Sequence, residues 1–212
     1  MWELVKAGGW LMLPLVLCSI FTLAITLERL IRLKRANVLP KNLLLQKDRS
    51  LDSVLDTLEQ DKAAANSTLG YILREGIDAF PQGEAYARAQ MEVTASREIG
   101  YLEKNVNFLG TLSAVAPLLG LLGTVLGIIE SFLVLDLGSN SNPTMMIPGI
   151  SKALITTAAG MVIAIPALFA YRYFQRLIQE YISELEQQST LFHATLFYRK
   201  PQAQDVEQKQ AS

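Results

Sequence analysis

The sequence predicts an all-α integral membrane protein with three transmembrane helices. Three long stretches carry no charged residue: residues 10–27, 105–129 and 153–171. A bilayer core about 30 Å thick needs about 20 residues of helix, so each stretch is long enough to cross it. The 212-residue chain has 19 basic and 20 acidic residues, and this near balance argues against a nucleic-acid-binding surface.

The first apolar stretch is expected to be a retained helix rather than a cleavable signal peptide. Its N-terminal flank, MWELVKAGG, has one lysine against one glutamate, and the basic cluster ERLIRLKR follows the stretch. A signal peptide has the opposite charge order and a small-residue cleavage site, and neither feature is present.

The charges also predict the orientation of the chain. Twelve of the 19 basic residues lie in 29–104, and five lie at or beyond Arg172. Because basic residues accumulate on the cytoplasmic side, the N-terminus is expected outside and the C-terminus inside. The expected segments are a periplasmic N-terminus (1–9), transmembrane helix 1 (10–28), a cytoplasmic helical domain (29–104), transmembrane helix 2 (105–135), a periplasmic loop (136–148), transmembrane helix 3 (149–172), a cytoplasmic helical extension (173–198) and a disordered tail (199–212).

Helical periodicity continues outside the apolar stretches. Apolar residues recur at helical spacing in 51–58, in 69–77 and in 174–185, and Pro40, Gly70 and the segment 81–83 are expected to interrupt helices. No strong breaker is found between Glu84 and Gly100, so one long helix is expected to run into the second apolar stretch. Charges of both signs alternate here, which is also typical of a solvated stalk with no activity of its own.

No catalytic, cofactor or metal site is expected. The single cysteine, Cys18, lies in the first apolar stretch, and His193 is the single histidine. These residues are too few for a metal site. The polar residues do not combine into a nucleophile, base and acid, so an enzyme is the least favoured class.

The second and third apolar stretches each carry a stripe of small and polar residues at heptad spacing. The stripes are Ser113, Pro117, Gly120, Thr124, Gly127 and Ser131, and Ala153, Thr157, Gly160, Ala164, Ala167 and Tyr171. Gly123 and Gly127 add a GxxxG pair. Helices in lipid associate through close packing of small residues and through hydrogen bonds between helices. The stripes therefore predict either tight packing within the subunit or a shared lining around a pathway.

Hydroxyl groups and prolines in these stretches leave the same two alternatives open. Pro117 and Pro166 each release a backbone carbonyl, which must find another partner in the membrane. A threonine can satisfy a carbonyl of its own helix, so Thr124 and Thr157 can serve either in this way or as lining residues. Ser113 and Ser131 are further candidates for a proton-pathway lining.

The apolar stretches contain no Asp, Glu, Lys, Arg or His. The nearest acids are Glu28 and Glu130, close to the ends of the first and second spans. A proton relay normally needs a titratable side chain inside the membrane. If protons cross here, a partner helix must supply that side chain.

Two segments carry a family resemblance: AVAPLLGLLGTVLGIIESF (114–132) and PGISKALITTAAGMVIAIPA (148–167). They resemble the ExbB/TolQ/MotA family of proton-channel subunits, and ExbB and TolQ most. The resemblance implies a bacterial inner-membrane pentamer around the single-span helices of an ExbD- or TolR-like partner, whose aspartate carries the proton. It implies that proton flow drives rotation or another motion passed to TonB or TolA. It also implies that Thr124 and Thr157 occupy the positions of the two threonines that line the family's pore.

The sequence departs from the family motif at two charged positions. The family usually has glutamate where this chain has Lys152, and a neutral residue where it has Glu130. The two spans run antiparallel through a short loop, so these residues are expected at similar depth. We therefore predict an ion pair between them. A role copied from the family's glutamate does not transfer to Lys152.

Three functions remain open from the sequence. The first is an ExbB-like stator subunit serving TonB, in which Thr124 and Thr157 hydrate the partner's carboxylate. The second is a TolQ-like subunit, or a divergent paralogue, serving another energised system. The third is a scaffold that holds partner helices and conducts nothing.

Overall fold

A computed structural model describes residues 8–45, 51–137 and 143–198, and every regular element within them is a helix. Three helices in this part of the chain are long and apolar enough to cross a membrane. They include α2 (Met12–Arg32), α8 (Val106–Leu137) and the first part of α9 (Ile147–Tyr198). The all-α prediction with three candidate spans is thus confirmed. The predicted tail, 199–212, lies outside the described residues.

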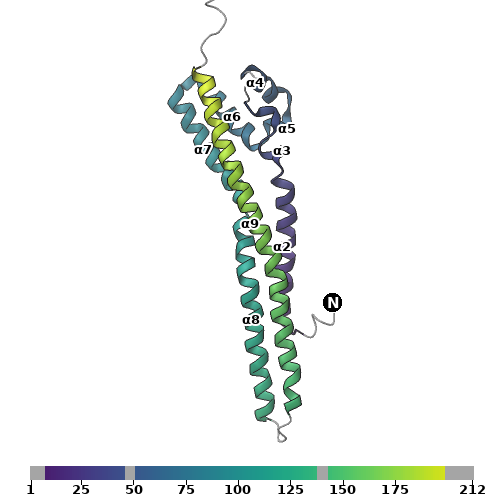
Figure 1. Ribbon diagram of the computed structural model, residues 1–212. Helices are drawn as coiled ribbons and strands as arrows, with labels where there is room; N and C mark the ends of the chain where they lie inside the picture. The colour runs from purple at the N-terminus through teal and green to yellow at the C-terminus, as the bar shows by residue number, and fades with distance from the viewer. Residues whose placement is uncertain (1–7, 46–50, 138–142, 199–212) are drawn as a thin grey trace, which may run out of the picture. The chain divides into compact units, whose positions relative to one another are not determined.

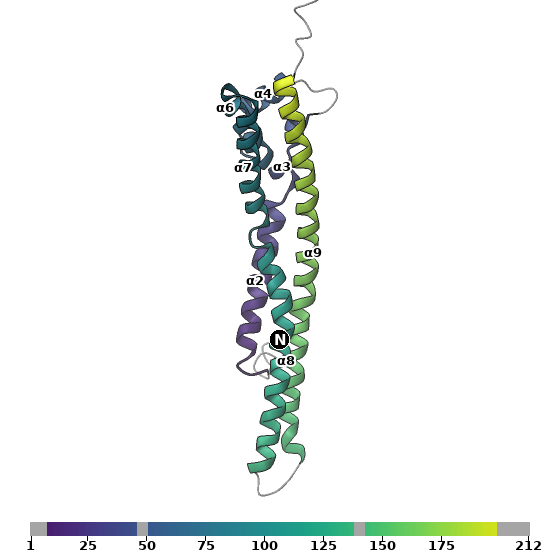
Figure 2. The same cartoon turned by 90° about the vertical axis from the view of Figure 1, so that its left-hand side faces the viewer.

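The chain divides into two compact units. The first, here called the membrane unit, contains α2 as far as Ile31, α8 and residues 147–176 of α9, and these helices run side by side (Figures 1 and 2). The second, here called the extramembrane unit, contains residues 32–102 and the rest of α9.

Small residues form the contact between α8 and α9, which we call the seam. A Cβ added to Gly120 would lie 3.1 Å from Thr157 Cα, and one added to Gly160 would lie 2.6 Å from the carbonyl oxygen of Ala116. Farther along, a Cβ on Gly127 would lie 2.7 Å from that of Ala153. No larger side chain fits at these glycines while the helices stay in place. The two predicted stripes therefore pack against each other within one subunit.

Helix α2 covers one side of the seam. Its buried residues recur every three or four positions, as expected for one helical face: Met12, Leu15, Cys18, Thr22, Ile25 and Arg29. Met12 and Leu15 form a buried cluster with Ala116 of α8 and Ala164 of α9. Cys18 is a buried free thiol. The apolar face of α2 thus completes a three-helix core.

The structure corrects the expectation of one continuous helix from Glu84 into the second span. Helix α7 (Glu84–Glu103) ends before α8 begins at Val106. Asn105 has a φ of 65°, a left-handed conformation that asparagine tolerates better than most residues. Its amide Nδ2 donates to Glu28 Oε2 of α2 at 3.0 Å, and its carbonyl accepts from Leu109 N. The side chain of Asn105 is thus held by α2, while its carbonyl accepts the first helical hydrogen bond of α8.

The extramembrane unit consists of short helices packed with α7 and the end of α9. They are α3 (Arg35–Val38), η1 (Lys41–Leu43), α4 (Leu51–Gln60), α5 (Lys62–Ala65), α6 (Thr68–Ala79) and η2 (Phe80–Gln82). The predicted periodicity in 51–58 and 69–77 matches α4 and α6. Gly70 does not interrupt a helix, contrary to expectation, because it lies in the first turn of α6 against the carbonyls of Ala64 and Ala65.

Candidate functional site

Thr157 lies on the seam, and Thr124 lies one helical turn along α8 from Gly120, the residue that Thr157 contacts; the two hydroxyls bond differently. Thr157 Oγ1 donates across the seam to the carbonyl oxygen of Gly120 at 2.9 Å. Thr124 Oγ1 donates within α8 to the carbonyl oxygen of Leu121 at 2.6 Å. Thr124 is four residues after Gly120 and therefore on the same face of α8. Both threonines are half-buried, so each reaches the surface of the membrane unit.

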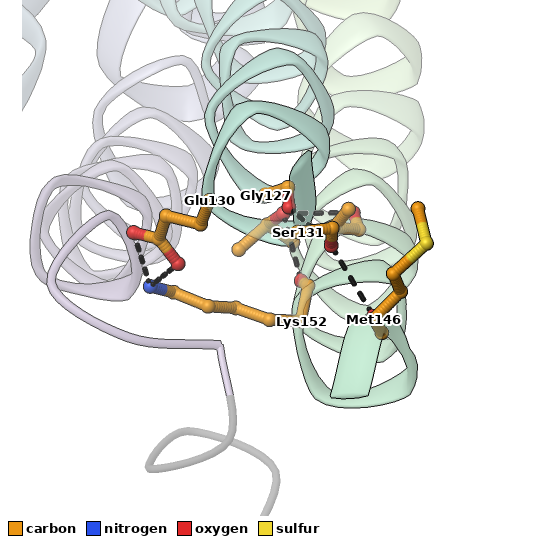
Figure 3. Close-up of polar contacts among 7 residues, drawn as sticks. Gly127, Glu130, Ser131, Met146 and Lys152 are labelled. Carbon is orange, nitrogen blue, oxygen red and sulfur yellow. Dashed lines mark hydrogen bonds and ion pairs between the residues drawn. The ribbon is translucent and has the colours of Figure 1, made fainter. Parts of the chain in front are cut away.

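The two serines named as lining candidates differ in burial. Ser113 is half-buried, and its hydroxyl donates to the carbonyl oxygen of Gly110 at 2.7 Å. Ser131 is only 2 % exposed and donates to the carbonyl oxygens of Gly127, at 2.8 Å, and Met146, at 3.2 Å. Figure 3 shows these bonds at the end of the α8–α9 hairpin. The placement of Ser131 favours a packing role over a lining role.

Thr156 is a seam residue that the sequence analysis did not single out. It is 1 % exposed, and its hydroxyl donates to the carbonyl oxygens of Lys152 and Ala153 at 3.1 and 2.8 Å. Gly123 leaves the space that Thr156 occupies, because a Cβ on Gly123 would meet the Thr156 hydroxyl. The sequence contained a signal for this contact. Gly123 and Thr156 each come one position before a stripe residue, Thr124 and Thr157 respectively.

Both prolines lie inside helices that continue through them. Pro117 is within α8 and Pro166 within α9. Because proline has no N–H, the carbonyls four residues earlier, those of Ser113 and Val162, lack their usual helical donor.

Glu130, near the end of α8, and Lys152, near the start of α9, lie together at what we call the loop end of the membrane unit (Figure 3). Lys152 Nζ lies 2.9 and 2.8 Å from the two carboxylate oxygens of Glu130. The side chains are 26 % and 48 % exposed, respectively. A cavity of about 380 Å³ adjoins the pair and is lined also by Ser131, Val134, Met145, Pro148 and Gly149.

The seam offers hydroxyls and backbone carbonyls but no titratable side chain at depth. In the described residues of the three spans, charged side chains occur only towards the helix ends, as with Glu28, Glu130 and Lys152. No group of three or more metal-ligating side chains occurs among the described residues. Hydroxyls can orient water or accept and donate hydrogen bonds, but a threonine cannot carry a proton by titration near neutral pH. The site is therefore a polar surface that can form hydrogen bonds but cannot itself take up and release a proton.

Comparison with known proteins connects this architecture to one family. Residues 64–187 match the model of the MotA/TolQ/ExbB proton channel family. A putative biopolymer transport protein, ExbB-like 1 of Synechocystis sp., is 34 % identical over 210 residues, which cover 92 % of this chain and 80 % of that protein.

Further relatives carry two different names. The biopolymer transport protein ExbB of Salmonella typhimurium is 32 % identical over 82 % of this chain and 75 % of its own length. The Tol-Pal system protein TolQ of Haemophilus influenzae is 37 % identical over 52 % of this chain and half of its own length. With a family match over more than half of its residues and relatives that align over most of its length, the chain belongs to the MotA/TolQ/ExbB proton channel family.

Proposed function

We propose that this protein is an ExbB-like subunit that couples the proton motive force across the bacterial inner membrane to transport at the outer membrane through a TonB-like protein. Similarity to proteins named ExbB or ExbB-like extends over most of the chain, which supports this choice. The subunit acts as a homo-oligomer, a pentamer, around the helices of a single-span ExbD- or TolR-like partner. Its N-terminus lies in the periplasm and its C-terminus in the cytoplasm, consistent with the distribution of basic residues.

In this function, Thr124 and Thr157 form part of the wall of the proton pathway. One observation carries the proposal. Two half-buried threonines lie near the same part of the seam, and the seam has no titratable side chain at depth in the described residues. The partner's aspartate then carries the proton, and the hydroxyls orient water and that carboxylate. Ser113, also half-buried, belongs to the same wall. Gly120, Gly123, Gly127 and Gly160 permit the close helix contact that holds it.

A TolQ-like role is the second candidate, and the similarity to TolQ proteins favours it. Two such relatives are 37 % and 38 % identical over 115 and 122 residues, a higher identity than for the ExbB proteins but over a shorter part of the chain. In that role the motion would pass to a TolA-like protein. Its function would be outer-membrane integrity rather than transport.

The experiment is proton flux into proteoliposomes that contain the subunit together with its single-span partner. Thr157→Val keeps the size of the side chain and removes the hydroxyl, so flux is expected to be lost while the complex stays intact. Thr111→Val is the matched control, because Thr111 is an exposed residue of α8 whose hydroxyl bonds only its own helix, at Asn107. If wild-type complex conducts no protons, or Thr157→Val lowers flux only when assembly is lost, the protein is a scaffold.

Deletion of the gene distinguishes the ExbB-like role from the TolQ-like role. Loss of siderophore uptake would support the ExbB-like role, whereas leakage of periplasmic proteins with normal uptake would support the TolQ-like role. The partner encoded next to the gene gives an independent check.

A further inference from the structure

Lys152, on α9, contacts two other parts of the membrane unit at the loop end. Its ammonium group pairs with Glu130 of α8, as described above. Its aliphatic stem packs on Gly9, in the turn that precedes α2: a Cβ on Gly9 would meet Lys152 Cε and lie 3.0 Å from Nζ. Gly9 also has a φ of +72°, so this position favours glycine for two reasons. Lys152 thus joins α9 to α8 and to the start of α2.

Thr156, one helical turn farther along α9, repeats this three-way contact. A Cβ on Gly8 would lie 3.4 Å from Thr156 Cγ2, and Gly123 of α8 faces the same threonine. The Thr156 hydroxyl returns to the carbonyl oxygen of Lys152 at 3.1 Å. The charged Lys152 and the buried Thr156 therefore hold the turn before α2 against two successive turns of α9.

The ion pair is well suited to fix this junction. Lipid provides no hydrophobic drive for helix association, so the few polar links between helices have a large share in setting their positions. The Lys152 ammonium contacts both Glu130 oxygens within hydrogen-bond distance, and its side chain is about three-quarters buried. A pair that is partly shielded from water is stronger than a fully exposed one.

We propose that Lys152 is a positioning residue that holds the turn before α2 and the end of α8 in fixed positions against α9. Through Thr156 and the seam glycines, this junction sets the position of Thr157 opposite Gly120. The inference rests on the proposed function only for its effect on proton flow. The structural part stands on the contacts of Lys152 alone.

The test measures a distance within one subunit by pulsed electron paramagnetic resonance. Spin labels replace Leu13 at the start of α2 and Leu133 near the end of α8, both of which are exposed, after Cys18 is changed to Ala. The protein is kept as the complete complex in bilayers, with labelled chains diluted by unlabelled ones. Lys152→Met keeps the stem and removes the charge, and is expected to convert one narrow distance into a broad distribution.

Four further variants sharpen the result. Glu130→Gln, alone or combined with Lys152→Met, is expected to broaden the distance distribution as much as Lys152→Met alone does. The same interaction is lost in all three variants. Lys152→Arg keeps the charge and is expected to retain the narrow distance. Ser151→Ala, the exposed neighbour, is the matched control. A narrow distribution in Lys152→Met or in Glu130→Gln would overturn the proposal, as would equal broadening in Ser151→Ala.

Proton flux through the same complexes tests the consequence for function. Lys152→Met is expected to lower flux about 2- to 30-fold, the range by which residues away from a site modulate it, with recovery in Lys152→Arg. Broadened distances with unchanged flux would overturn the link to Thr157. If wild-type complex conducts no protons, the proposed function fails, whereas the distance measurements still decide whether Lys152 holds the junction.

Discussion

The two parts of α9 pack with different chemistry. Between residues 147 and 167, the buried residues of α9 are small, as where Gly160 approaches the Ala116 carbonyl. Between 177 and 198, the buried side chains are large: Ile178, Tyr181, Leu185 and Phe192. One continuous helix thus belongs to two different kinds of core.

The solvent around each part explains the difference. In water, large apolar side chains drive association, because each one removed from water contributes about 1.5–3 kcal/mol. In lipid, an exposed leucine is already in an apolar environment, so close backbone contact and hydrogen bonds between helices take over. This comparison predicts that truncation is most damaging in the extramembrane unit, and that enlargement is most damaging in the membrane unit.

Phe192→Ala is expected to have the largest effect. Phe192 is completely buried, and truncation of such a residue costs about 3–5 kcal/mol through lost burial and a cavity. The measurement is thermal unfolding of the detergent-solubilised protein followed by circular dichroism. Leu191→Ala, at the exposed neighbouring position, is the control. Equal losses in the two variants would contradict a water-type core in this unit.

Gly160→Ala is expected to cost about 1–3 kcal/mol, because the new methyl group meets backbone atoms of α8 that cannot move independently. Gly100→Ala in α7 is the matched control. A Cβ there meets nothing within 4 Å, so the change is expected to stabilise the helix by up to about 1 kcal/mol. The midpoints of unfolding of the two variants should move in opposite directions. If they move together, the seam is not limited by backbone contact.

Much of the fold could be predicted from the sequence because its signals are local. The uncharged stretches predicted the three spans, and helical periodicity predicted α4, α6 and the extension of α9. The break at Asn105 could not be predicted. It depends on a left-handed backbone conformation and on a hydrogen bond to Glu28, 77 residues away in the sequence.

The candidate site could be predicted in part, again because part of its sequence signal is local. Heptad spacing placed the small residues on matching faces, yet it did not reveal which hydroxyl would cross the seam. Thr156 and Thr157 are adjacent and chemically identical, and their roles separate only through the rotation of α9 against α8. Thr157 bonds Gly120, whereas Thr156 bonds carbonyls of its own helix. Such rotation is a tertiary property.

Two matched hydrogen bonds allow a closer test of the comparison. Tyr181 Oη donates to the carbonyl oxygen of Leu33 in the extramembrane unit, and Thr157 Oγ1 donates to that of Gly120 in the membrane unit, each at 2.9 Å. Tyr181→Phe is expected to cost about 1 kcal/mol. Thr157→Val is expected to cost about 0.6 kcal/mol, the average for such bonds between membrane helices. Unfolding free energies in detergent measure both.

The small cost expected for Thr157→Val also separates stability from function. A variant that stays folded and assembled but conducts no protons would assign the hydroxyl to the pathway. A large loss of stability would instead make Thr157 a packing residue like Thr156.

Arg35→Gln is expected to have the smallest effect. Arg35 pairs with Glu184 at 2.8 Å, but the two side chains are 51 % and 37 % exposed, and such surface pairs contribute about 0.2–1 kcal/mol. The difference between Arg35→Gln and wild type should nearly vanish in about 1 M salt, where charges are screened within about 3 Å. Glu184→Gln should give the same small loss, and the double variant should lose no more than either single variant. A larger, salt-insensitive loss would mean that this pair, like the residues around Phe192, is part of the buried core of the extramembrane unit.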